Sequence, residues 1–312
     1  MTTSLSDLRL FCLHLANKYD SLDAVSEEQK ANEFRSVYMR NLPPNLKTLR
    51  AVAAACGINL ASLEQGKMPK NVRGYHEVLD GNRKIYFKQG DTISGIENTI
   101  LHEIREMMEP VFAEVCPDYE PLRTLAVHLA ANRFASAVLL PRNTFEKKVS
   151  ESGLDVIALA NQYHKSCSQT LIRMGEVLQG KLFFYGALYE RISNGRPELM
   201  VTYWTRSWNE ESSEANVHGV DQLFPRKGHS VLPGSLVDGT LSEKRAHLVN
   251  HITILDEGDD DGLTAIAQPL MLNKATPLKV ALVVTLLQDK KLLQPQIERT
   301  NPVIIDSFHH HL

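Results

Sequence analysis

Residues of the types that bind zinc lie close together in the segment "LHEIREMME", residues 101–109. His102 and Glu106 are four residues apart, so on a helix they face the same side and are close enough to share one ion. Imidazole nitrogens and carboxylate oxygens are both ordinary zinc ligands. Glu103 is displaced around such a helix, where it can approach a water molecule beside the ion. The spacing predicts two ligands and a general base, and a third ligand must come from another segment.

The segment around this motif has the apolar spacing of an amphipathic helix. Apolar residues recur at positions 96, 100, 101, 104, 107 and 108, and Pro110 is expected to limit the helix. A string of this kind also arises by chance in charged helices, where Arg105 and Glu109 would form a salt-bridged surface. The motif alone therefore leaves both interpretations open.

A second predicted helix, over residues 120–138, offers a third ligand. It has small residues at Ala126, Ala130, Ala131, Ala135 and Ser136, which allow a neighbouring helix to approach closely. His128 lies near its middle, so a close-packed helix pair would bring this imidazole to the ion. Before the first helix, "VRGYHEVL" and "RKIYFKQG" flank Asp80-Gly81, which is a strong tight-turn signal and predicts a β-hairpin.

The order "GYHEVLDGNRKIYF", "ENTILHEIRE", "HLAANRFASAVLLPRNTF" resembles the ImmA/IrrE family of zinc metallopeptidases over roughly residues 47–146. The family has a second histidine where this chain has Glu106, and a ligand glutamate where this chain has His128. The two departures compensate, because together they keep two histidines and one carboxylate. The resemblance implies a Zn2+ cofactor held by His102, Glu106 and His128, and peptide-bond hydrolysis with Glu103 as the general base.

Other side chains are candidates for supporting roles. Cys116 follows the motif in "VCPDYEP" and is a candidate inhibitory fourth ligand, although a loop cysteine without a role is the more economical interpretation. Tyr75, His76 and Tyr119 are candidate transition-state stabilisers, and the spacing does not select among them.

We expect an α+β fold with a mainly helical, zincin-like peptidase domain that carries a small β-sheet. The predicted divisions are a peptidase domain over 1–148, a helical linker over 149–180, a β-rich domain over 181–298 and a tail over 299–312. The strands "GLTAIAQPLML" and "LKVALVVTLL" give the third segment a resemblance to GAF-type α/β sensor domains. An unrelated α+β domain used for packing or dimerisation fits these residues equally well.

Composition excludes several classes of protein. The 312 residues are 43% hydrophobic and 23% charged, which is typical of a globular protein. The net charge of -3 gives no general footprint for nucleic acid. No apolar stretch is long enough to span a bilayer, and the four scattered cysteines suit reduced thiols, so we expect a cytoplasmic protein without a membrane partner.

The family resemblance also implies a partner and a role. Such peptidases cut a helix-turn-helix repressor in stress or phage-defence responses. A sensor domain in the C-terminal part would bind a small-molecule or nucleic-acid activator. A homodimer is compatible with this scheme. Two alternatives stay open: a DNA-binding regulator, because "LRAVAAACGINLASLEQG" at 49–66 has helix-turn-helix spacing, and a non-catalytic metal-binding sensor.

Overall fold

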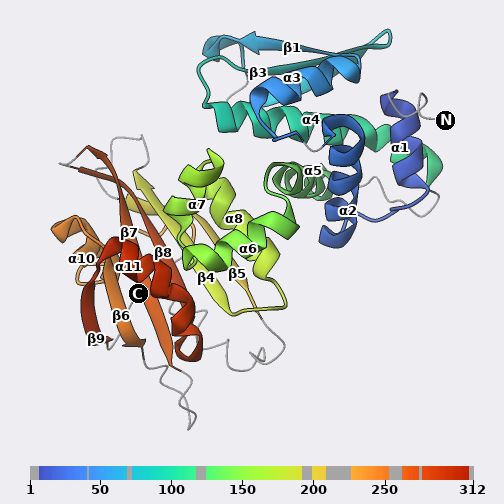
Figure 1. Cartoon of the computed structure of the whole chain (residues 1–312). Coiled ribbons are helices and arrows are strands. Elements are labelled where there is room, and N and C mark those ends of the chain that lie inside the picture. The colour runs from blue at the N-terminus through green and yellow to red at the C-terminus, as the bar shows by residue number, and fades with distance from the viewer. Residues whose placement is uncertain are drawn as a thin grey trace. The chain divides into compact units, whose positions relative to one another are not determined.

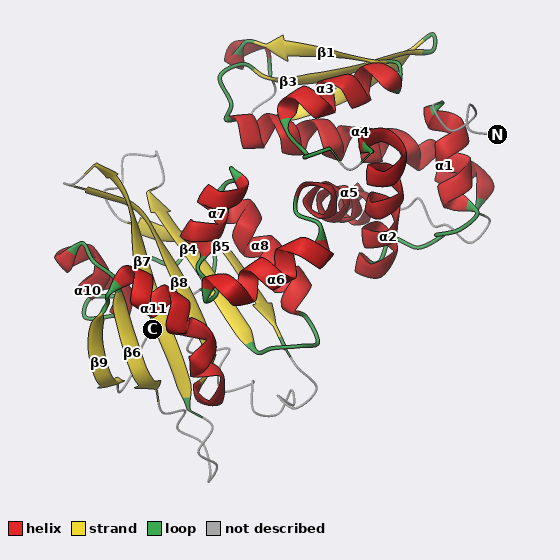
Figure 2. Cartoon of the chain, in the orientation of Figure 1, coloured by secondary structure: helices red, strands yellow, loops and turns green. Residues whose placement is uncertain are grey.

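The computed structural model describes residues 7–40, 42–68, 72–116, 124–191, 199–208, 226–252, 262–273 and 276–308. The chain divides into two compact units, Met1–Pro141 and Arg142–Leu312 (Figure 1). Each unit contains both helices and a sheet, so the chain has an α+β fold (Figure 2). No helix among the described residues is both long and apolar enough to cross a membrane.

The N-terminal unit consists of a three-stranded sheet and the helices that pack with it. Its elements are α1 (Leu8–Ala16), α2 (Ala24–Phe34), the π-helical turn η1 (Arg35–Met39), α3 (Leu46–Ala55), β1 (Ile58–Leu63), the 3-10 turn η2 (Gln65–Lys67), β2 (Gly74–Leu79), β3 (Asn82–Lys88), α4 (Ile93–Val115) and α5 (Thr124–Leu139). The strand order is β1-β3-β2, with β1 parallel and β2 antiparallel to β3. Asp80 and Gly81 both have positive φ, at 48° and 79°, which confirms the predicted hairpin turn.

Helix α4 is the centre of this unit and packs against α1, α3, α5, β2 and β3. Its N-cap residue Thr92 accepts a hydrogen bond from the backbone N–H of Gly95. The helix continues through Pro110 to Val115, so the expectation that Pro110 limits it was wrong. Val111 and Phe112 are buried beyond the proline, and this packing outweighs the backbone hydrogen bond that proline cannot donate.

The segment 49–66 does not form a helix-turn-helix. Helix α3 ends at Ala55, Gly57 has a φ of 68°, and the following residues pair in register with β3 as strand β1. The β-branched and apolar residues after Gly57 are therefore sheet residues. The DNA-binding alternative loses the second helix on which it depended.

The C-terminal unit is a six-stranded sheet with helices on its faces. Its helices are α6 (Arg142–Ser152), α7 (Val156–Tyr163), α8 (Cys167–Leu178), α10 (Leu236–Glu243), the 3-10 segment η4 (Leu287–Leu293) and α11 (Gln294–Thr300). Its strands are β4 (Phe184–Arg191), β5 (Leu199–Ser207), β6 (His247–Ile252), β7 (Leu263–Asn273), β8 (Thr276–Leu286) and β9 (Val303–Phe308). They lie in the order β5-β4-β8-β7-β6-β9, antiparallel except for the parallel pair β6 and β9.

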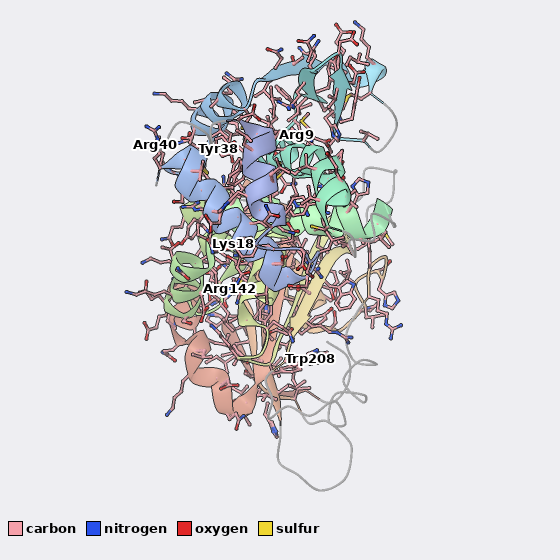
Figure 3. The ribbon with its side chains drawn as sticks, turned by 90° about the vertical axis from the view of Figure 1, so that its right-hand side faces the viewer. Arg9, Lys18, Tyr38, Arg40, Arg142 and Trp208 are labelled. Atoms are coloured by element: carbon pink, nitrogen blue, oxygen red, sulfur yellow. The ribbon has the colours of Figure 1, made fainter. Side chains whose placement is uncertain are left out.

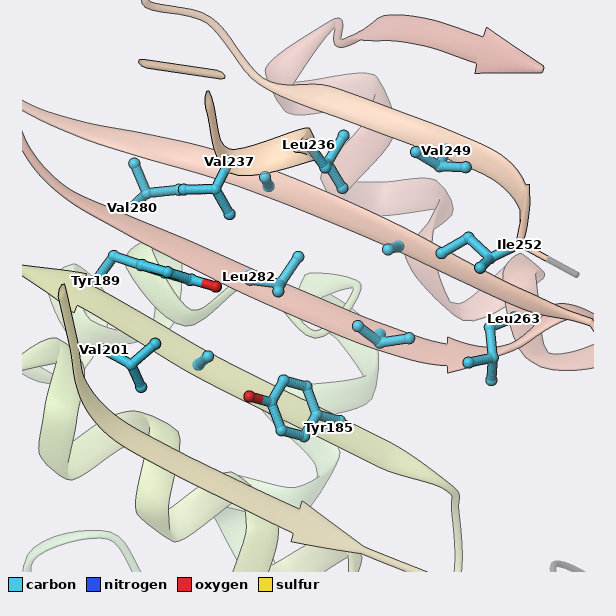
Figure 4. Packing of buried hydrophobic residues seen from close by; sticks show 14 of the residues in the cluster. Tyr185, Tyr189, Val201, Leu236, Val237, Val249, Ile252, Leu263, Val280 and Leu282 are labelled. Atoms are coloured by element: carbon cyan, nitrogen blue, oxygen red, sulfur yellow. The ribbon is translucent and has the colours of Figure 1, made fainter. Parts of the chain in front are cut away.

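The two faces of this sheet are covered by different helices. One face carries a buried cluster that includes Tyr185, Tyr189, Val249 and Leu282, and α10 covers it with Leu236 and Val237 (Figure 4). On the other face α8 lies close to β4 and β5. A Cβ atom at Gly175 would lie 2.0 Å from Thr205 Oγ1, so only glycine allows α8 to approach this closely.

The predicted linker and tail both belong to the C-terminal unit. Residues 154–179 form two helices, because His164 adopts a φ of 53° between α7 and α8, and α8 buries Leu171 and Met174. Arg142, labelled in Figure 3, donates hydrogen bonds to the backbone oxygens of Glu176 and Val177, so α6 is tied to α8. The predicted tail 299–312 includes β9, which pairs with β6. The boundary therefore lies at Pro141–Arg142, earlier than the predicted 148.

Candidate metal centre

The predicted ligand helices α4 and α5 pack against each other inside the N-terminal unit. Three of the alanines expected to allow a close approach, Ala130, Ala131 and Ala135, have no solvent-exposed surface. His102 and Glu106 lie one turn apart on α4, and His128 lies on α5. The short side chains of α5 therefore bring the imidazole of His128 beside the α4 motif.

The three predicted ligands converge on one point. His102 Nε2 lies 3.1 Å from Glu106 Oε1 and 3.2 Å from His128 Nδ1, and His128 Nδ1 lies 2.5 Å from the same Glu106 oxygen. A tetrahedral zinc ion with bonds of about 2.0–2.1 Å holds its ligand atoms about 3.3 Å apart. The cluster is thus close to the spacing that zinc requires, and the two-histidine, one-carboxylate set fits this ion.

Asn132 orients the first ligand and was not predicted. Its Oδ1 lies 2.9 Å from His102 Nδ1, and because an amide oxygen only accepts, Nδ1 carries the proton. When the ring is neutral, the lone pair is then on Nε2, which faces the cluster, as in metal sites whose histidines are held by an outer hydrogen bond. The signal in the sequence was the spacing, since Asn132 lies four residues after His128 on the same face of α5.

The predicted general base, Glu103, lies on α4 and is only 5% exposed. Its Oε2 is 2.7 Å from His76 Nδ1, and the same nitrogen lies 3.9 Å from Glu106 Oε2. Of the three candidate stabilisers, the structure therefore brings His76 to the cluster. Tyr75, its neighbour on β2, instead stacks on Tyr86 with ring centroids 4.8 Å apart. Tyr119 lies outside the described residues.

Electrostatics couples His102 to Glu106. Burial alone lowers the pKa of His102, but the hydrogen bond and the charge of Glu106 outweigh it and raise this pKa above its usual value of 6.5. Burial alone raises the pKa of Glu106, but the hydrogen bond from His102 and the neighbouring histidines hold it below 4.5. The metal-free cluster therefore favours an ionised carboxylate beside a protonated imidazole, and a metal ion would replace that proton.

Cys116 is not brought to the cluster, which corrects the expectation of an inhibitory fourth ligand. It is the C-cap of α4, ten residues after Glu106, and a helix rises about 1.5 Å per residue, so the two Cα atoms are about 15 Å apart. Its Sγ lies 3.5 Å from the backbone oxygen of Ala16, toward α1. Burial raises the pKa of the thiol, which disfavours the thiolate that a metal would need.

The alternative of a solvated, salt-bridged helix does not describe Arg105. This guanidinium is fully buried and binds both carboxylate oxygens of Glu27, at 2.7 and 2.8 Å, and one of Glu109 at 3.0 Å. It points toward α2, whereas His102 and Glu106 face α5. Arg105 and Glu109 thus belong to a cluster separate from that of His102 and Glu106.

Comparison with known proteins gives a likeness of fold. No model of a known protein family matches the chain, and no curated protein matches it. A solved structure of a transcriptional regulator from Mycobacterium tuberculosis is similar, with a TM-score of 0.51 and 12% sequence identity. The match covers 98% of this chain and 88% of that chain. At this identity, the likeness indicates that the two chains share an α+β fold.

Proposed function

We propose that this protein is a zinc-dependent endopeptidase, with a zincin-like peptidase fold in the unit Met1–Pro141. The observation that carries the proposal is the convergence of His102, Glu106 and His128 within 3.2 Å of one another. The two exchanged residue types, which looked incompatible with the family pattern in isolation, here meet at one point. Zinc bound there would supply a Lewis acid that polarises a peptide carbonyl and makes a water molecule more acidic.

The residues around the cluster have separate tasks in this reaction. Glu103 takes the proton of the attacking water and passes it to the leaving amine, and its burial keeps competing solvent away from the carboxylate. Asn132 keeps His102 in the tautomer that can bind metal. Strand β2 is the last strand of the order β1-β3-β2, so an extended peptide can pair with its outer edge beside Glu103.

The proposed substrate is a helix-turn-helix repressor, in a stress or phage-defence response, as the resemblance to ImmA/IrrE peptidases implies. The C-terminal unit is proposed as a GAF-like sensor that binds a small-molecule or nucleic-acid activator. A single sheet with strands "GLTAIAQPLML" and "LKVALVVTLL" paired antiparallel as β7 and β8 supports that assignment. A homodimer in the cytoplasm is compatible with this role.

The test combines metal analysis with cleavage of a proteome-derived peptide library. We expect one zinc per chain after the terminal histidines at 309–311 are replaced by alanine, because a run of three histidines can itself bind metal. Glu103→Gln should keep the zinc and lower cleavage by about 10²–10⁴-fold, the usual size of general-base catalysis. His128→Ala should lose both zinc and cleavage.

His14→Gln is the matched control for these variants, because His14 is an exposed histidine of α1 in the same unit. It should change neither zinc content nor cleavage. A wild-type chain that binds well below one zinc, or one that binds zinc and cleaves no peptide, would contradict the proposal.

The second outcome leads to the other candidate function, a metal-binding regulator without turnover. The observation that favours it is the fold shared with a protein described as a transcriptional regulator. The Glu103→Gln variant distinguishes the two candidates. It should lose cleavage activity if the protein is a peptidase, whereas a non-catalytic regulator has no activity to lose.

A further inference from the structure

We propose that His76 is a positioning residue that fixes the orientation of the Glu103 carboxylate. Its catalytic consequence rests on the peptidase function proposed above, whereas its structural part does not. His76 Nδ1 lies 2.7 Å from Glu103 Oε2, which is the distance of a charge-assisted hydrogen bond. With Oε2 held by this donor, Oε1 is left to accept a proton from water.

His76 lies beside Glu103 because strand β2 of the hairpin runs along helix α4. Gly74 faces Thr99 and His76 faces Glu103, so a step of two residues on β2 matches a step of four on the helix. Two strand residues advance about 6.6 Å and four helix residues about 6 Å, so the two periods agree. The contact is a consequence of the packing of the two elements.

Gly74 sets how closely the strand approaches. A Cβ atom there would lie 2.2 Å from Thr99 Cγ2 and 2.6 Å from the backbone oxygen of Tyr86. Any side chain at 74 would push β2 away from α4 or disturb its pairing with β3. The glycine therefore allows the close approach on which the contact between His76 and Glu103 depends.

The surroundings of Glu103 explain why it needs a partner of this kind. The carboxylate side chain is 7% exposed, and that of His76 is 27% exposed. A buried carboxylate without a donor loses hydration that nothing replaces, and its rotamer is then set by packing alone. His76 supplies this donor, so the Glu103 carboxylate is held by strand β2 as well as by its own helix.

The same three groups, His76, Glu103 and Glu106, also have ligand atoms within 4.8 Å of one another, so a second metal ion is the competing explanation. The contact distances favour the hydrogen bond, because His76 Nδ1 is 2.7 Å from Glu103 but 3.9 Å from Glu106. A second ion would moreover bind Glu103 as a ligand and remove it as a base.

The experiment compares three substitutions of His76 in the full chain. The amide nitrogen of His76→Asn can occupy the place of Nδ1, that of His76→Gln the place of Nε2, and His76→Leu offers no donor. Crystal structures should show the Glu103 carboxylate in its original orientation in the Asn variant and displaced in the Leu and Gln variants. Glu77→Gln, on the same strand, is the matched control and should leave Glu103 in place.

Kinetics adds a readout that a merely structural role would not produce. We expect kcat to fall about 10–100-fold in His76→Leu, as for a catalytic group misplaced by about 1 Å, while KM changes less than about twofold. His76→Asn should recover most of kcat and His76→Gln should not, and all variants should hold one zinc.

Three results would overturn the proposal: an unmoved Glu103 in His76→Leu, equal kcat for the Asn and Gln variants, or two metal ions per wild-type chain with one lost in His76→Leu. If the wild-type chain cleaves no peptide, the peptidase proposal fails. The orientation of Glu103 in the variant structures then still decides the role of His76.

Discussion

At position 106 a carboxylate stands beside an imidazole, and this pairing makes the metal-free cluster depend on pH. The raised pKa of His102 means that its interaction stabilises the fold fully below pH 6.5 and is lost as the pH rises through the raised value. The lowered pKa of Glu106 means that its interaction is present above pH 4.5 and is lost as the pH falls through the lowered value. Both contributions are therefore fully present together between pH 4.5 and pH 6.5.

We therefore expect Glu106→Gln to destabilise the metal-free protein more at pH 5.5 than at pH 8.5. The measurement is urea unfolding in the presence of a chelator, with Glu114→Gln as the control, since Glu114 is an exposed carboxylate of the same helix. A loss of stability that is equal at both pH values would contradict the pairing of His102 with Glu106. With zinc in place of the chelator, Glu106→Gln should destabilise the protein more at pH 8.5 than at pH 5.5, because zinc binds His102 only without its proton.

The convergence of the three candidate ligands could be predicted from sequence, but the hydrogen-bond roles of Asn132 and His76 could not. His102, Glu106 and the helical setting follow from a spacing of four residues, and His128 follows from the family pattern. Asn132 and His76 act through hydrogen bonds to side chains 30 and 27 residues away. Such contacts depend on the packing of α5 and β2 against α4, which a local pattern does not specify.

At the scale of elements, a buried ion network joins α2 to α4. Glu27 accepts hydrogen bonds from Arg105 and from Lys30 Nζ at 2.8 Å, and all three side chains are fully buried. Arg105 and Lys30 also lie over the Phe112 ring, 5.0 and 4.6 Å from its centroid. The network fixes the face that α4 turns toward α2, and hence the face that carries His102 toward α5.

Removing Arg105 should cost far more stability than removing an exposed arginine of the same unit. Arg105→Met leaves Glu27 as a buried charge with one partner fewer, and we expect a loss of about 3–5 kcal/mol in the free energy of unfolding. Arg9, labelled in Figure 3, pairs with Glu114 at 2.9 Å, but both side chains are more than half exposed, so Arg9→Met should cost less than ~1 kcal/mol. Chemical denaturation measures both, and similar losses would contradict this account.

The types of most elements could be predicted, and their ends could not. The hairpin follows from Asp80-Gly81, and β7 and β8 follow from their apolar runs. The helical linker predicted over 149–180 is interrupted at His164, whose left-handed backbone no local signal indicated. Pro110 was expected to stop α4, yet burial of Val111 and Phe112 carries the helix five residues further. Tertiary packing decides these boundaries.

At the scale of the whole molecule, the two units should respond separately to metal. The candidate ligands all lie in Met1–Pro141, so zinc bound to them should raise the stability of that unit alone. Free zinc at 100 times its Kd stabilises a binding unit by about 2.7 kcal/mol. In calorimetry of the full chain, a chelator should shift one of two transitions, and in His128→Ala it should shift neither. Equal shifts of both transitions would show that the units unfold together.

The parallel pairing of β9 with β6 also bears on the order in which the molecule forms during synthesis. Domains generally fold from the N-terminus while the chain is being made. Every residue of the His102, Glu106 and His128 cluster precedes Pro141, whereas the sheet of the second unit lacks its outer strand until Val303–Phe308 has been added. For part of each synthesis cycle, the three candidate ligands are therefore already present on a ribosome-bound chain whose proposed sensor is not yet complete.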